Sequence, residues 1–356
     1  MTDILTDSIG ESKSETNKKL KKNVICMGAD IGTMNLVLAR SDSKDIKITR
    51  NVFLPLKEDE VSITELSDIS YVKGEDNIYV IGQDAFRLAN IFGHKLSRPM
   101  SQGLISQKEI DAIDVLTLML KDLIGNIKDK EVYCSYSVPG SPLDSERSVT
   151  YHEKVFARIL GSLGINYSPI NESMAIIYSE CQKEAFSGIG ISFGCGMTNC
   201  TLAYKGLEVM KFSTTRGGDY IDFETSNSLG IVQNRVTSIK ERLLDLSSDF
   251  MTEKNKKTRR VLEGIHYYYT SLLDYTIKEI INEFNDKVEI EIDEKIPIII
   301  SGGTSLPKGF LELFKNNISK HDLPFEISEI RRARNPLTAV ASGLLIKTLS
   351  DVKTNT

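Results

Sequence analysis

Short apolar runs alternate with amphipathic stretches along most of the chain. Residues 24–29 form a run typical of a buried strand, and a second run at 36–39 follows after a turn that contains glycine and asparagine. Two apolar runs joined in this way predict a β-hairpin. The pattern recurs in the second half, where runs at 189–193 and 200–204 flank another Gly-rich turn. A repeated hairpin predicts two related halves that face one another.

Helix and strand patterns lie between and after the hairpins. Apolar residues three and four positions apart predict a helix over 110–124, with Ile110 and Ile113 on its buried face. The other predicted elements are helices over 145–163 and 307–318 and strands over 131–138 and 296–301. Alternation of strands and helices is typical of α/β architecture.

Composition changes this picture little. The 356 residues are 40% apolar and carry a net charge of −5, which argues against a dedicated nucleic-acid binder. The five cysteines are scattered and form no CxxC pair. We therefore expect no zinc site, no disulfide framework and a cytoplasmic location.

The first 22 residues differ from the rest of the chain. They are rich in Ser, Thr, Asp and Lys, which predicts a flexible tail. A short apolar face formed by Met1, Ile4, Leu5 and Ile9 leaves an interfacial membrane anchor as the alternative. Acidic residues between these positions oppose anionic lipid and favour the tail.

Three Gly-rich turns that follow strands carry the candidate chemistry. Small residues let backbone N–H groups approach phosphate oxygens, so facing turns predict a polyphosphate clamp. The turn residues are Gly32, Thr33, Met34 and Asn35 in the first, Gly194, Gly196, Met197, Thr198 and Asn199 in the second, and Gly302, Gly303 and Thr304 in the third. Asp30 ends the first strand beside its loop, where a lone carboxylate holds a hydrated Mg²⁺ through water.

The motifs resemble those of the actin-like ATPase superfamily, in the same order. Residues 30–35 resemble its first phosphate loop, 192–199 its second, and 300–305 its adenosine motif. Residues 170–175 are similar to the start of its interdomain helix, in which a Glu or Gln positions the hydrolytic water.

Two further segments resemble the bacterial actin branch of the MreB, ParM and MamK types. They are 216–222, which follows the second hairpin, and 236–241. The resemblance makes Gly217, Gly218, Asp219, Lys240 and Glu241 candidate nucleotide contacts. An exposed ion pair on a helix is the alternative interpretation of Lys240 and Glu241.

The resemblance implies an α/β fold of the actin and heat-shock-chaperone ATPase type, a duplicated ribonuclease H-like fold with two lobes around a nucleotide cleft. The expected subdomains are a first large one over 23–53, 96–184 and 334–350, a small insert over 54–95, a second large one over 185–226 and 297–333, and a second insert over 227–296. These insert sizes resemble bacterial actins and leave no room for a substrate-peptide domain.

Glu172 is the candidate catalytic residue. By resemblance it orients the attacking water, whereas the simpler interpretation is a Glu that complements a helix dipole after the N-cap Asn171. One departure concerns Ser192, because the second phosphate loop of this superfamily usually begins with Asp. We expect its loss to slow hydrolysis more than it weakens nucleotide binding.

These features predict an actin-like protein that binds Mg-ATP or Mg-GTP and polymerises head to tail, with slow hydrolysis and a cytoskeletal or positioning role. A non-hydrolysing ATP-binding scaffold and a small-molecule kinase of the same fold are the alternatives. The expected partner is the chain itself, with room for an adaptor protein. Apolar residues at 52–54 and 91–92 are expected at longitudinal contacts. The basic run 254–260 is interpreted as a solvated loop or a filament contact.

Overall fold

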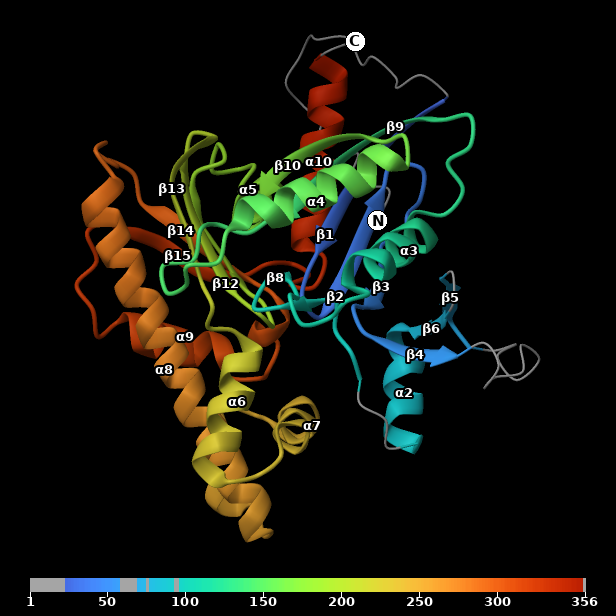
Figure 1. Cartoon of the computed structure of the whole chain (residues 1–356). Helices are drawn as coiled ribbons and strands as arrows, with labels where there is room; N and C mark the ends of the chain where they lie inside the picture. Colours follow the sequence, from blue (N-terminus) through green and yellow to red (C-terminus); the bar gives the residue numbers. More distant parts are fainter. Residues whose placement is uncertain (1–22, 58–68, 75–76, 93–95, 355–356) are drawn as a thin grey trace.

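A computed structural model describes residues 23–57, 69–74, 77–92 and 96–354 (Figure 1). The tail expected over 1–22, with its alternative as a membrane anchor, lies outside the described residues. Residues 91 and 92 end a described helix, but only the side chain of Ile91 is described.

Two five-stranded sheets form the centre of the molecule, one in each lobe (Figure 1). The strands of the first are, in spatial order, β10 (Asn166–Asn171), β9 (Glu131–Val138), β1 (Val24–Ile31), β2 (Asn35–Arg40) and β3 (Lys47–Arg50). Those of the second are β13 (Leu207–Thr214), β12 (Thr198–Tyr204), β11 (Gly188–Phe193), β14 (Ile296–Ser301) and β15 (Ile327–Arg332).

The two sheets have the same topology. Each opens with a strand, β1 or β11, that pairs antiparallel with the next strand of its hairpin and parallel with a later strand of the same lobe. The two edge strands are the third and fifth of each sheet in chain order. They are β3 and β10 in the first sheet and β13 and β15 in the second. This repetition confirms the predicted duplication and the α/β fold class.

A glycine at an equivalent place in each lobe admits a helix against the sheet. A Cβ atom at Gly28 of β1 would lie 2.2 Å from the carbonyl oxygen of Ala341 on α10 (Ala339–Thr354), and one at Gly190 of β11 would lie 2.5 Å from that of Ser173 on α5 (Glu172–Glu180). Two residues after these glycines come Asp30 and Ser192. The duplication therefore aligns Ser192 with Asp30.

The remaining elements cover the sheets or form the inserts. The small strands are β4 (Phe53–Lys57), β6 (Asn77–Ile81) and β5 (Tyr71–Lys73), which form one sheet, and the pair β7 (Met100–Ser101) and β8 (Leu104–Ile105). The helices are α2 (Gly82–Phe92), α3 (Ala112–Ile124), α4 (Val149–Ser162), α6 (Gly218–Leu229), α7 (Gln233–Leu243), α8 (Lys256–Lys287) and α9 (Phe310–Ile318), with 3-10 turns η2 (Phe250–Thr252) and η3 (Gly303–Ser305).

Three predicted helices begin later than expected. Helix α3 starts at Ala112, so Ile110 lies before it and is 99% exposed, and Ile113 lies on its solvent side. Helix α4 starts at Val149 because the residues before it form a loop, in which the Ser145 hydroxyl accepts from the Arg147 amide. Helix α9 starts at Phe310.

The expectation for residues 52–54 was wrong. Val52, Phe53 and Leu54 are all at least 96% buried, because Val52 and Leu54 pack in the core of the small sheet and Phe53 packs in the main core of the first lobe. Ile91 is exposed, as expected. Apolar residues where the insert begins thus pack inside the molecule rather than against another molecule.

Candidate functional site

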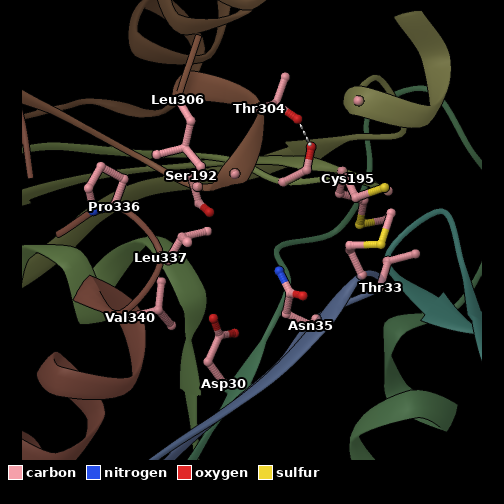
Figure 2. A pocket seen from close by; sticks show the side chains of 18 of the residues that line it. Asp30, Thr33, Asn35, Ser192, Cys195, Thr304, Leu306, Pro336, Leu337 and Val340 are labelled. Carbon is pink, nitrogen blue, oxygen red and sulfur yellow. Dashed lines mark hydrogen bonds between the residues drawn. The ribbon is translucent and has the colours of Figure 1, made fainter. Parts of the chain in front are cut away.

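A cavity of about 620 Å³ lies between the two lobes (Figure 2). The turns of both long hairpins border it, together with the end of β14 and one side of α7. The predicted site residues that line it are Asp30, Gly32, Thr33, Met34, Asn35, Glu172, Gly194, Gly196, Met197, Asn199, Gly218, Lys240, Glu241, Gly302, Gly303 and Thr304. The fold thus brings together residues spread over most of the chain.

The turn of the first hairpin is fixed by its own backbone and by one buried amide. The Gly32 amide donates to the Asn35 carbonyl at 3.0 Å, and the Asn51 side chain donates to the Gly32 carbonyl at 2.9 Å. The second turn closes in the same way, since the Gly194 amide donates to the Met197 carbonyl at 2.9 Å. Each lobe therefore holds a rigid turn at the cavity.

A short link joins the two turns. The Thr33 hydroxyl accepts from the Gly103 amide at 3.0 Å, and Gly103 in turn packs against Met197 of the second turn. The turns consequently approach one another closely, with the cavity beside them.

Asp30 is the last but one residue of β1 and points toward the middle of the cavity in Figure 2. The Ser137 hydroxyl donates to its Oδ1 at 3.0 Å and accepts from the Ile31 amide at 2.8 Å. Burial raises the pKa of the Asp30 carboxyl, and the Ser137 hydrogen bond opposes that rise. Asp30 is therefore a buried carboxylate at the cavity wall, held in place by the Ser137 hydroxyl.

Glu172 is the first residue of α5 and faces the same space. Asn171 caps the helix, because its side chain accepts from the amides of Ser173 and Met174, as predicted. The Ser192 hydroxyl donates to Glu172 Oε1 at 2.6 Å, and the Asn199 side chain donates to Oε2 at 2.9 Å. Both oxygens of Glu172 are thus held by residues of the second hairpin.

Burial, and then the charge of Asp30, raise the pKa of Glu172, and the Ser192 hydrogen bond lowers it in part. Because the charge of Asp30 raises the pKa of Glu172, the two carboxyl groups form a site that favours a cation. Within the described residues no group of three or more His, Cys, Asp or Glu side chains could hold a metal ion directly. A hydrated Mg²⁺ bound through water to Asp30 fits this pair, because its charge would offset theirs.

The far side of the cavity carries the third turn and α7. The Thr304 hydroxyl donates to the Gly194 carbonyl at 2.8 Å, which joins the third turn to the second (Figure 2). Lys240 donates to the Gly218 carbonyl at 3.0 Å and pairs with Asp222 at 2.9 Å. Glu241 pairs at 3.6 Å with Arg50 of the first lobe.

Three predicted site residues do not line the cavity. Thr198 is buried, and its hydroxyl donates to the Arg216 carbonyl. Gly217 packs against the backbone of Cys195. Asp219 instead accepts two hydrogen bonds of 2.9 Å from Arg98 of the first lobe. Thr198 and Gly217 therefore contact the backbone beside the second turn, and Asp219 joins the two lobes.

Several lining residues were not predicted. They are Ser137, Pro139, Arg50, Cys195, Tyr269, Leu306, Pro336, Leu337 and Val340. The last four and Tyr269 form an apolar wall that comes from three segments far apart in sequence, so no local pattern marks it. Ser137 had a signal, because it ends the strand adjacent to β1 and so lies beside Asp30.

Other properties of the chain bear on its setting. All five cysteines are free thiols, as expected. Among the described helices, none is both long enough and apolar enough to cross a membrane.

Two similar lobes, each with a hairpin turn at a shared cavity, define an actin-like fold. The chain belongs to the Volactin family, whose profile matches residues 25–348. No curated protein matches the chain.

Solved structures of bacterial actin-like proteins share this fold. A MamK double helical filament matches with a TM-score of 0.70 at 16% identity, over 92% of this chain and 99% of that one. MreB5 of Spiroplasma citri bound to AMPPNP gives a TM-score of 0.67 at 15% identity, with 94% and 99% covered. The ethanolamine utilization protein EutJ from Carboxydothermus hydrogenoformans gives 0.52 at 16% identity, with 93% and 91% covered. The predicted bacterial actin-like fold is therefore confirmed.

Proposed function

We propose that this protein binds a magnesium-bound nucleoside triphosphate, ATP or GTP, between its lobes and assembles head to tail into filaments, with slow hydrolysis. The observation that carries the proposal is the pair of rigid hairpin turns at one cavity, a turn from each lobe. Similar proteins add support, because MreB5 of Spiroplasma citri was solved with AMPPNP and MamK as a filament.

Backbone amides of the two turns hold the phosphates, since small residues there leave the N–H groups accessible. Lys240 and Glu241 lie on the nucleoside side, and the apolar wall with Leu306 and Leu337 provides a surface for the base. Asp30 holds the Mg²⁺ through water. When bound, this ion supplies positive charge that offsets the phosphates and the carboxylates.

Glu172 orients the attacking water and accepts its proton at a carboxylate oxygen. Its oxygens already accept from Ser192 and Asn199, which fix its position but compete for its lone pairs. The second lobe offers a serine where the first has Asp30, so only one lobe supplies a carboxylate for the metal's water shell. Slow turnover follows from both features.

The test is pelleting of the protein with Mg-ATP, Mg-GTP, Mg-ADP and no nucleotide, with phosphate release followed in the same tubes. We expect pelleting with a triphosphate, accompanied by slow phosphate release. No pelleting at high protein concentration would contradict the filament proposal. Phosphate transfer that depends on an added sugar would favour a small-molecule kinase.

The hydrogen bond from Ser192 to Glu172 favours one second candidate, a scaffold that binds nucleotide without turnover. Ser192→Asp distinguishes the two, because it adds the carboxylate that superfamily members usually carry. For a slow ATPase, this substitution should raise phosphate release in Mg²⁺, with Ser192→Ala as control. For a scaffold, nucleotide-dependent pelleting should occur with no release in the wild type.

A further inference from the structure

Helix α8 is the longest element of the described chain, with 32 residues, and it runs along one side of the second lobe (Figure 1). Its N-terminal end lies beside α6 and α7, whereas its C-terminal end lies near the outer strands of the second sheet (Figure 1). The core packs against its middle through residues such as Ile265, Leu272 and Ile277. Its two ends are therefore held at opposite ends of the lobe.

The N-terminal end of α8 is strongly basic. Residues 254–260 contain five cations and no anion: Lys254, Lys256, Lys257, Arg259 and Arg260. Arg259 pairs at 4.0 Å with Glu263 of the same helix, and the described residues offer the other four no ion-pair partner. The neighbouring Met251 side chain is 67% exposed. This surface, 251–260, is called the basic end below.

The C-terminal end is acidic. The loop that follows α8 contains four anions and no cation within 289–294: Glu289, Glu291, Asp293 and Glu294. All four are exposed, and Ile290 between them is 45% exposed. Lys295, which comes next, pairs with Glu326 at 3.2 Å. This surface, 289–294, is called the acidic end below.

The basic end opposes the dipole of the helix. Cations are unfavourable near a helix N-terminus and anions near a C-terminus. The first turn of α8 contains no acidic residue, and Lys287 is the only basic residue of its last turn. The first turn would be more stable with acidic residues, so local stability does not account for the basic end. Most of the acidic end lies beyond the last turn of the helix, where the dipole no longer acts.

We propose that the basic end of one molecule binds the acidic end of the next copy. A helix of 32 residues is several times longer than the Debye length of about 8 Å at physiological salt, so the two ends do not reach one another within a molecule. A two-fold contact between two identical ends would bring like charges together, and antiparallel pairing of two α8 helices would match the charges but close as a dimer. A head-to-tail contact satisfies both ends and does not close, as the proposed polymerisation requires. Met251 and Ile290 add an exposed apolar residue on each side.

This contact rests on the proposed polymerisation and specifies where the copies touch. Charge reversal at each end tests it. Variant A carries Lys254→Glu, Lys256→Glu and Lys257→Glu, which change the net charge of residues 251–260 from +4 to −2 and make both ends acidic. Variant B carries Glu289→Lys, Glu291→Lys and Glu294→Lys, which change that of residues 289–294 from −4 to +2 and make both ends basic. None of these six side chains has an ion-pair partner in the described residues, so the substitutions break no ion pair within the molecule.

Each variant alone should need at least about tenfold more protein to pellet with Mg-triphosphate, because like charges meet at the contact. An equimolar mixture of A and B should pellet again, since acidic ends then meet basic ends in alternation. A chain that carries all six substitutions should also assemble. The melting temperature should be unchanged or higher, because glutamates at the first turn of α8 suit the helix dipole.

The matched control is Lys44→Glu with Lys128→Glu and Lys130→Glu, which changes the net charge by the same amount as variant A but in exposed loops elsewhere. It should assemble at the wild-type concentration. If the wild type assembles and both A and B do so equally well, filament formation stands and the proposed contact is wrong. If A and B fail but neither the mixture nor the sixfold variant assembles, charge complementarity is likewise refuted. A wild type that never pellets refutes polymerisation itself, and this contact with it.

Discussion

At the scale of single residues, the chemistry of the cavity depends on how Glu172 is held. Glu172 directly follows β10 of the first sheet, whereas its two oxygens accept from Ser192 and Asn199 of the second lobe. A change in the angle between the lobes would therefore disturb these two hydrogen bonds.

Glu172→Gln should keep nucleotide binding and lower phosphate release by about 100-fold, because an amide cannot accept the proton of the attacking water. Single-turnover phosphate release, with nucleotide affinity measured in parallel, checks this. Glu146→Gln is the control, since that carboxylate is exposed on the loop before α4. An unchanged release rate in Glu172→Gln would exclude Glu172 from catalysis.

The nucleotide-free protein should lose stability as the pH rises through the neutral range. The raised pKa values of Asp30 and Glu172 mean that the folded chain retains protons that the unfolded chain has released. The free energy of unfolding therefore falls with pH above the ordinary carboxyl range near 4.

Burial lowers the pKa of His152 to about 4, which has the opposite effect, complete above the ordinary histidine pKa near 6.5. Comparison of the wild type with Glu172→Gln cancels this contribution. Thermal unfolding from about pH 5 to about pH 9 should show a weaker fall in the variant. Equal slopes would mean that Glu172 ionises normally.

At the scale of elements, the crossing of α5 and α10 joins the two lobes. Helix α10 packs on the first sheet through Ala341 and Leu345, and α5 packs on the second beneath Gly190. The two helices meet at Gly343, where a Cβ atom would lie 1.7 Å from the carbonyl oxygen of Ala175. Their contact requires a residue with no side chain.

Gly343→Ala should therefore lower the free energy of unfolding by about 3 kcal/mol, because the helices must separate to admit a methyl group. Denaturant unfolding measures this. Ser342→Ala at the adjacent position is the control, since its side chain makes no hydrogen bond in the described part of the chain. Equal stability of the two variants would show that the crossing adapts without cost.

Sequence patterns predicted the hairpins well because each is local and ends in a Gly-rich turn. They predicted helix starts less well. Ile110 continues the apolar spacing of α3 but precedes its first turn, and periodicity alone does not reveal a helix start. The phosphate turns were found from their residues. The apolar wall was not, because Leu306, Pro336 and Val340 meet only in the folded chain.

At the scale of the whole molecule, two ion pairs of the described residues cross between the lobes beside the cavity. Arg98 pairs with Asp219 at 2.9 Å, and Arg50 pairs with Glu241 at 3.6 Å. Both lie near the cavity but outside the phosphate turns. They favour the closed arrangement in which the turns meet.

Arg98→Ala should weaken nucleotide binding about fivefold, which corresponds to about 1 kcal/mol for a half-exposed pair. Titration with a fluorescent nucleotide analogue measures the dissociation constant. The control is Arg87→Ala, because the ion pair that Arg87 makes with Asp84 lies within α2 and does not join the lobes. An unchanged affinity would mean that closure does not depend on this bridge.

Helix α8 also sets a length. Because α8 joins the basic end to the acidic end, its length sets the spacing of successive subunits. Its 32 residues span roughly 48 Å at 1.5 Å per residue, and the axial repeat of the polymer should be close to that value. The repeat, measured from filament images, should stay the same in the wild type, in the sixfold charge-reversed variant and in the mixed polymer, because charge decides which ends meet while the helix decides how far apart they are.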